Sequence, residues 1–166
     1  MFSGFGVSFR SYSVLLVSSI SHLEKDNLGG SIVISSARLV GYLEEVAGLR
    51  PGNKLRIGLD IPDWIWRRRS YRIACLRGLI DTDGSLYLHR YKVNGKWYVY
   101  PKLCFCSMSE PLRQSVFRLL KGLGFSPRMA ATSPQVFIDR ADEAKRFYRM
   151  IGSRHARHRS LSGILS

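Results

Sequence analysis

One short segment, residues 71–84, joins a helical pattern to a strand pattern through two acidic residues, and this junction restricts the fold more than any other feature. Its apolar residues recur at the spacing of an α-helix: Ile73, Leu76, Leu79 and Ile80. The helical pattern stops at residues 81–84 (Asp-Thr-Asp-Gly), and residues 85–91 then alternate as a half-buried strand does. The segment therefore predicts a helix that carries two carboxylates at its C-terminal end and leads directly into a sheet.

These two carboxylates stand where a helix disfavours negative charge. The C-terminal end of a helix dipole repels anions, so Asp81 and Asp83 at this position indicate a bound cation. An Asp-rich turn closed by Gly84 is the alternative interpretation. Ala74 and Gly78, four residues apart, lie on one side of the same helix, where small side chains let a second helix backbone approach closely. We therefore expect both a cation site and helix pairing at this segment.

The rest of the chain supplies the elements around this junction. Upstream we expect β-rich stretches at residues 7–20 and 31–35 and a helix over 37–49. Downstream, the Asn94-Gly95 pair predicts a type I′ hairpin turn, followed by a helix over 111–123, short strands at 128–132 and 135–139, and a helix over 142–151. The order from residue 71 is α-β-β-α-β-β-α, which predicts an α+β fold with an antiparallel sheet. We place an N-terminal β/α arm at residues 1–66 and the main module at residues 67–166.

The chain has a large excess of basic residues: 26 Lys and Arg stand against 12 Asp and Glu, a formal charge of +14 over 166 residues. Residues 84–138 contain eight basic residues and one acid, and residues 144–166 contain six and none. This distribution favours a nucleic-acid partner. The apolar runs are too short to span a bilayer, and three cysteines, an odd count, disfavour a disulfide framework. We therefore expect no membrane partner and an intracellular protein that is not secreted, either cytoplasmic or associated with a nucleoid or organelle.

The predicted hairpin has two different faces. Alternation places aromatic and cationic residues together on one face: Tyr87, His89, Tyr91, Tyr98, Tyr100 and Lys102. The opposite parity contains Val99, Leu103 and Phe105, and we expect helices to cover it. A two-stranded ribbon with such side chains fits the major groove of a DNA duplex, so the first face is predicted to read base pairs. The remaining cations are expected to contribute phosphate contacts: Arg90, Lys92, Lys96, Arg128, Arg157 and Arg159. An ordinary solvent-exposed face is the alternative.

Residues 76–84 (Leu-Arg-Gly-Leu-Ile-Asp-Thr-Asp-Gly) match the nine-residue signature of the LAGLIDADG homing endonucleases at seven of nine positions, with departures at Arg77 and Thr82. Residues 61–65 (Ile-Pro-Asp-Trp-Ile) are similar to a stretch that precedes this signature in archaeal and intein-type members. The α-β-β-α-β-β-α order also resembles the module of that family. The resemblance covers about residues 31–159.

This resemblance implies an active site built from two copies of the motif helix. Because the chain has one motif, it implies a homodimer, with interface residues Ala74, Gly78, Arg77 and Asp81. It makes Asp83 the ligand of Mg²⁺, with Thr82 contributing its carbonyl; Mn²⁺ could replace this metal, as could Ca²⁺ in a non-cleaving complex. A basic residue that assists at the scissile phosphate would be Lys54 or His158, while Cys106 stands where a polar residue would position water.

The function implied by the resemblance is site-specific cleavage of double-stranded DNA. The enzyme would be a metal-dependent endodeoxyribonuclease that makes a double-strand break in a long, pseudo-palindromic target. Two alternatives remain open on the same fold: an RNA maturase that assists intron splicing, and a catalytically inactive DNA-binding regulator. The intact pair Asp81 and Asp83 favours cleavage, since a pure binder needs no acid at that point.

Overall fold

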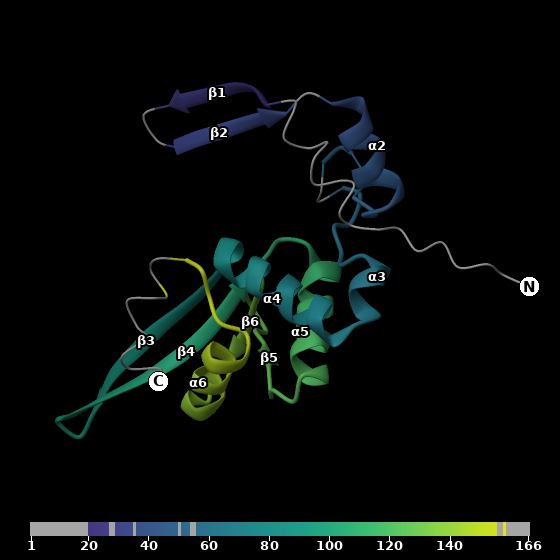
Figure 1. Ribbon diagram of the computed structural model, residues 1–166. Helices are drawn as coiled ribbons and strands as arrows, with labels where there is room; N and C mark the ends of the chain where they lie inside the picture. The colour runs from purple at the N-terminus through teal and green to yellow at the C-terminus, as the bar shows by residue number, and fades with distance from the viewer. Residues whose placement is uncertain are drawn as a thin grey trace, which may run out of the picture. The chain divides into compact units, whose positions relative to one another are not determined.

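A computed structural model describes residues 20–26, 29–34, 36–49, 51–53, 56–155 and 158 (Figure 1). The chain divides into two compact units, Met1–Arg50 and Pro51–Ser166, and each is described here by itself. None of the helices within the described ranges has the length and apolar character needed to cross a membrane.

In its described residues, the first unit contains a hairpin and one helix. Strand β1 (Ile20–Asp26) pairs antiparallel with β2 (Gly29–Ile34), and helix α2 (Ala37–Glu45) follows. Ser36 caps this helix, because its hydroxyl oxygen accepts a hydrogen bond from the backbone N–H of Leu39 at 3.3 Å. No residue of α2 is buried, so this helix contributes little to a hydrophobic core.

The second unit is an antiparallel sheet with helices packed against it. Its elements, in chain order, are α3 (Asp63–Trp66), α4 (Arg69–Asp83), β3 (Gly84–Val93), β4 (Lys96–Cys106), α5 (Glu110–Gly122), β5 (Arg128–Met129), β6 (Gln135–Ile138) and α6 (Ala141–Met150). The strand order is β3-β4-β6-β5, with antiparallel pairing throughout. The predicted α+β class and the α-β-β-α-β-β-α order are therefore confirmed, with the short α3 added before them.

The hydrophobic core lies between one face of this sheet and the helices. The sheet contributes residues that are at most 4% exposed: Leu86, Leu103, Phe105, Val136 and Ile138. The helices contribute Leu76 and Ile80 from α4, Val116, Leu119 and Leu120 from α5, and Ala144 and Phe147 from α6. Burial of this many large apolar side chains is the main favourable term for folding, at roughly 25 cal/mol per Å².

The division between the units differs from the sequence prediction. We expected the arm to extend to residue 66, but Ile61 and Ile65 are 6% and 8% exposed and belong to the core of the second unit. Trp64 of α3 contacts Tyr71 of α4 edge to face, with ring centroids 5.6 Å apart. The short helix α3 therefore belongs with the motif helix rather than with the arm.

The hairpin β3–β4 extends beyond the helices. Its turn has positive φ at Asn94 (50°) and Gly95 (78°), as the predicted type I′ turn requires. We expected helices to cover the whole aliphatic face of this hairpin. That expectation is wrong at the outer end of the hairpin, where Val99 is 47% exposed. The strands are simply longer than the helical layer, so the outer end of the hairpin has two solvent-facing sides.

Candidate active site and nucleic-acid interface

Helix α4 and strand β3 meet without a loop, and Gly84 makes this junction possible. A Cβ atom at residue 84 would lie 2.6 Å from the Cα of Ile80, closer than side chains tolerate. Only glycine therefore allows the strand to start immediately after the last helical residue, Asp83. Leu76 and Ile80 point into the core, and the helix end is held rigidly as a result.

Asp83 lies at this helix end with an exposed side chain. Its Oδ2 is 3.3 Å from the hydroxyl of Thr82, which also lies 3.1 Å from the carbonyl oxygen of Gly78. Among the described residues, no cationic side chain forms an ion pair with Asp83. The carboxylate thus faces solvent at the negative end of the helix dipole.

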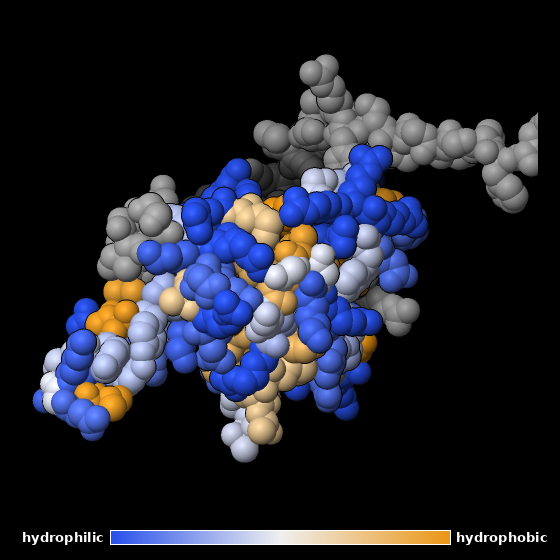
Figure 2. All heavy atoms as spheres, turned by 90° about the horizontal axis from the view of Figure 1, so that it is seen from below, coloured by the Kyte–Doolittle hydropathy of each residue, from blue (hydrophilic) through white to orange (hydrophobic). Residues whose placement is uncertain are grey.

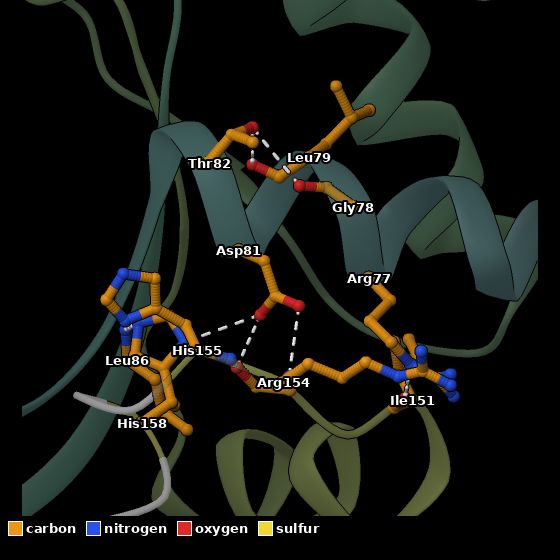
Figure 3. A network of polar contacts seen from close by, with 11 residues as sticks. Arg77, Gly78, Leu79, Asp81, Thr82, Leu86, Ile151, Arg154, His155 and His158 are labelled. Carbon is orange, nitrogen blue, oxygen red and sulfur yellow. Dashed lines mark hydrogen bonds and ion pairs between the residues drawn. The ribbon is translucent and has the colours of Figure 1, made fainter. Parts of the chain in front are cut away.

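Asp81, two residues earlier, is held in a polar network shown in Figure 3. Its Oδ1 accepts a hydrogen bond from the hydroxyl of Ser153, and its Oδ2 accepts one from the backbone N–H of Arg154 at 3.0 Å. Burial alone would raise the pKa of the Asp81 carboxyl, but these two hydrogen bonds and the backbone N–H of His155 hold the pKa below its ordinary value. Asp81 therefore braces the helix end against the segment that follows α6.

His158 completes this network from the interior, where it is 2% exposed. The backbone N–H of Leu86 donates to its Nε2 at 3.2 Å, so this nitrogen carries no proton. Its Nδ1 lies 2.8 Å from the Ser153 hydroxyl and 3.8 Å from Oδ1 of Asp81. The sequence assigned His158 to the scissile phosphate, but both ring nitrogens face protein groups. The structure instead places this residue as a buried link between β3 and the C-terminal segment.

Arg77, which is predicted to lie in a dimer interface, contacts its own chain. Its Nε donates to the carbonyl oxygen of Ile151 at 2.6 Å, at the C-terminal end of α6 (Figure 3). Ala74 and Gly78, by contrast, are exposed, and a Cβ atom at residue 78 would meet nothing within 4 Å. The small-residue side of α4 is therefore open within the part of the chain that the structure describes.

The aromatic side of the hairpin, here called the tyrosine face, consists of Tyr87, His89, Tyr91, Tyr98, Tyr100 and Lys102. In the strand register Tyr87 is opposite Lys102, His89 opposite Tyr100 and Tyr91 opposite Tyr98. The rings of Tyr91 and Tyr98 are stacked with centroids 5.4 Å apart, and the hydroxyls of Tyr91 and Tyr100 contact each other. The predicted grouping of these side chains on one face is therefore present as a packed cluster.

Two of the predicted DNA-binding cations, Lys102 and Arg128, form ion pairs with the same carboxylate, and the sequence did not predict this contact. Asp139 binds Nζ of Lys102 at 3.0 Å and Nε of Arg128 at 2.8 Å. The hydrogen bond from Arg128 is the main reason that the pKa of Asp139 lies below its ordinary value, with Lys102 also lowering it against the effect of burial. Asp139 follows β6 directly, and the β4–β6 register places it level with Lys102. Only that long-range pairing could have revealed the contact.

The other predicted cations fall into two groups. Arg90, Lys92 and Lys96 are exposed on the hairpin, with Lys92 lying 5.8 Å from the ring centroid of Trp97 and Lys96 lying 5.6 Å from that of Tyr98. Lys54, Arg157 and Arg159 lie outside the described residues.

A polar side chain stands beside the position where Cys106 departs from the family pattern. The β4–β6 register pairs Cys106 with Gln135, so the two side chains point to the same side of the sheet. The amide oxygen of Gln135 accepts a hydrogen bond from the Ser133 hydroxyl at 2.9 Å. Because Gly84 pairs with Phe105, this pair lies at the same end of the sheet as Asp83. Gln135 is therefore a polar residue near the site that the sequence alone did not indicate.

No group of three or more His, Cys, Asp or Glu side chains is close enough to hold a metal ion within the described ranges of one chain. Burial raises the pKa of the Cys104 thiol to about 11, so the free thiol is protonated at neutral pH. The exposed carboxylate of Asp83 is therefore not part of such a group within these ranges.

Comparison with known proteins places this arrangement in a family. The LAGLIDADG-like domain family matches residues 70–152, half of the chain, from the first turn of α4 to the end of α6. Among solved structures, a crystal structure of the meganuclease I-SmaMI bound to uncleavable DNA is similar, with 14% identity and a TM-score of 0.41. That match covers 77% of this chain and 42% of the other. No curated protein matches. The family match spans the junction helix, the four-stranded sheet and both following helices, and this chain therefore belongs to the family of LAGLIDADG-like domains.

Proposed function

We propose that this protein is a homing endonuclease that hydrolyses both strands of a DNA duplex with the help of a divalent metal ion. The observation that supports it most directly is the contrast between the two carboxylates at the end of α4. Asp81 accepts hydrogen bonds from Ser153 and Arg154, whereas the only hydrogen-bond partner of the Asp83 carboxylate among the described residues is the Thr82 hydroxyl. A carboxylate kept exposed at the negative end of a helix is costly unless a cation binds to it.

We further propose that two chains complete the site as a two-fold homodimer. At the end of α4 each chain offers one exposed carboxylate, Asp83, and a two-fold axis beside α4 would bring two of them together. Ala74 and Gly78 leave room for the partner helix, and the missing contact at the Gly78 Cβ position supports this. The same symmetry predicts a roughly palindromic target.

In this proposal Asp83 and the carbonyl of Thr82 would hold Mg²⁺. When bound, the metal ion supplies water activation and neutralisation of charge on the attacking and leaving oxygens. The chain's own residues do the rest. The tyrosine face lies along the major groove, Arg90, Lys92 and Lys96 bind phosphates, and Asp81 keeps the helix end in place.

The test compares Asp83→Asn with Asp81→Asn. The protein is incubated with a pool of duplexes carrying a randomised segment, with Mg²⁺ or with a chelator, and cut ends are identified by sequencing. We expect metal-dependent cutting by the wild type, no cutting by Asp83→Asn with duplex binding and stability retained, and a loss of stability for Asp81→Asn. Cutting by Asp83→Asn at the wild-type rate would contradict the role of Asp83. Duplex binding without any cutting by the wild type would favour a DNA-binding regulator instead.

The dimer is tested separately with Gly78→Leu. Because a Cβ atom at this position meets nothing within 4 Å in the chain, the variant should fold but sediment as a monomer on a duplex target. Gln114→Leu adds the same side chain at an exposed position of α5 and is the matched control. A wild-type protein that binds its target with one chain per site would refute the homodimer.

A further inference from the structure

The segment that follows α6 binds residues on both sides of Asp83. Two residues before Asp83, the Asp81 carboxylate accepts a hydrogen bond from the hydroxyl of Ser153. Three residues after it, the backbone N–H of Leu86 donates to Nε2 of His158 at 3.2 Å. In Figure 3 these partners lie against the end of α4 and the start of β3. The junction that carries Asp83 is therefore held at both of its ends.

These two contacts belong to one chain of hydrogen bonds, here called the junction clamp and made of Ser153 and His158. The Ser153 hydroxyl lies 2.8 Å from Nδ1 of His158, so the bonds run from Asp81 through both residues to Leu86. His158 is 2% exposed, and water therefore has little access to compete for its ring nitrogens. The backbone N–H of His158 also donates to the carbonyl oxygen of His155 at 3.1 Å. The junction clamp thus connects helix and strand directly, without passing through Asp83.

Asp83 needs such support because it is the last residue of α4. Helix ends fray, and unwinding by one residue would turn the last side chain by roughly 100° and shift it by about 1.5 Å. A metal-binding arrangement tolerates errors of only about 0.5 Å and about 10–20°. The last turn of α4 contains no basic side chain that could offset the charge of its carboxylates at the negative end of the helix dipole. Contacts from elsewhere in the chain must therefore limit the movement of this helix end.

The strand side of the junction needs support as well, because β3 leads into a hairpin that projects into solvent. Figure 2 shows this projecting end at the lower left, with orange side chains between blue ones, and Val99 within it is 47% exposed. Leu86, near the start of β3, is only 4% exposed. Movement of the free end, such as a bound duplex would cause, is passed along the strand toward Asp83. The hydrogen bond to His158 limits that movement at Leu86.

The chemistry of the junction clamp indicates that it specifies a geometry and does not only add stability. Buried polar groups cost free energy unless they are paired, and apolar packing of the same volume would stabilise a link equally well. Ser153 and His158 use directional hydrogen bonds instead, and each ring nitrogen of His158 has a partner. A fully paired buried network holds one arrangement of its atoms. At this place, that arrangement fixes the residues on either side of Asp83.

We propose that Ser153 and His158 are positioning residues that hold the Asp83 carboxylate in the orientation in which it binds a divalent metal ion. This inference rests on the proposed function, in which Asp83 is a metal ligand. His158 acts from the interior, through the backbone of β3, and touches neither the metal ion nor the scissile phosphate. Ser153 acts through Asp81 and the end of α4.

The experiment compares two amide substitutions of His158 in the full chain. In His158→Gln the amide oxygen can take the place of Nε2 and accept from Leu86, whereas the shorter side chain of His158→Asn reaches only the place of Nδ1. Electron paramagnetic resonance of free Mn²⁺ gives the metal affinity of each variant on a duplex target, independently of cleavage. We expect His158→Asn to weaken Mn²⁺ binding by about 10- to 100-fold, the usual effect of losing a residue that orients a metal ligand. His158→Gln should restore most of the affinity.

Ser126→Ala is the matched control for lost stability. It removes a hydrogen bond to the buried carboxylate of Glu143, in the first turn of α6 and so at the opposite end of that helix from the junction clamp. Its Mn²⁺ affinity should stay within about twofold of the wild type. Urea unfolding measures the stability of every variant. If His158→Asn does not fold, Ser153→Ala and Ser153→Thr replace the pair, since threonine keeps the hydroxyl that binds Asp81.

Three outcomes would contradict the inference, and they can be told apart. Equal Mn²⁺ affinity for the wild type and His158→Asn would overturn it and leave the proposed function standing. The same would follow if Ser126→Ala lost as much Mn²⁺ affinity as His158→Asn, because reduced stability would then explain both losses. A wild type that binds Mn²⁺ no better than Asp83→Asn would refute the proposed function, and this inference with it.

Discussion

Ser153→Ala should destabilise the protein far more than an ordinary change of a partly exposed serine. The hydroxyl of Ser153 donates a hydrogen bond to Oδ1 of Asp81 and accepts one from the backbone N–H of His155 at 3.1 Å. It also lies 2.8 Å from Nδ1 of His158. Because Leu86 N–H occupies the other ring nitrogen, Nδ1 carries the proton and needs this acceptor.

The size of the effect follows from what the substitution leaves without a partner. His158 is 2% exposed, so its Nδ1–H loses its acceptor where water has little access, which costs about 1–3 kcal/mol. Loss of a hydrogen bond to the charged Asp81 adds about 1.5 kcal/mol, at the lower end of the usual range, because the Asp81 side chain is 18% exposed and keeps its bond from Arg154. The expected total is about 2.5–4.5 kcal/mol. Total stabilities of native domains are only about 5–15 kcal/mol.

The assay is urea unfolding of the full chain, followed by far-UV circular dichroism and by tryptophan fluorescence. Trp64 and Trp66 both report on the second unit, where they pack against its core. Ser85→Ala removes the hydroxyl of an exposed serine at the start of β3 and should change the free energy of unfolding by less than about 0.5 kcal/mol. If Ser153→Ala also stayed below that value, the network would not be what holds the helix end.

Three further predictions rest on single positions. Gly84→Ala should destabilise by about 1–3 kcal/mol, since its Cβ would lie 2.6 Å from a backbone carbon of the preceding helical turn, whereas Gly78→Ala, with open space around it, should stabilise the isolated chain by about 0.5–1 kcal/mol in the same assay. Asp139→Asn should release Lys102 and Arg128 from their ion pairs, so duplex binding should tighten and its salt dependence should steepen. Unchanged salt dependence would mean that neither cation reaches a phosphate. The pKa of Asp81 is lowered on folding, so its contribution to stability is present at neutral pH and is lost as pH falls below about 4. The difference in unfolding free energy between the wild type and Asp81→Asn should therefore shrink in acid. A difference that grew in acid would mean that folding raises this pKa.

The local features of the site could be read from the sequence because they depend on neighbouring residues. Helical spacing and the acids at residues 81 and 83 predicted the end of α4, and alternation predicted the composition of the tyrosine face. The Asn94-Gly95 turn was also predictable, since few residue pairs adopt positive φ at both positions. These local patterns were enough to predict the α+β fold class, the acidic end of α4 and the tyrosine face.

The tertiary structure decided which of these side chains are available. Asp81 and Asp83 look equivalent in the sequence, but Ser153, more than 70 residues away, engages the first and leaves the second exposed. The family resemblance made His158 a candidate for assisting at the scissile phosphate, whereas packing against β3 buried it.

The same holds for the charge and exposure of the sheet. Pairing of β4 with β6 brings Asp139 to Lys102, and the finite length of the helices leaves Val99 and Trp97 in solvent. Residue patterns along one strand specify which face a side chain occupies, because the alternation of a strand is a local property. What covers that face depends on contacts between distant segments, and those are set only when the whole core is packed.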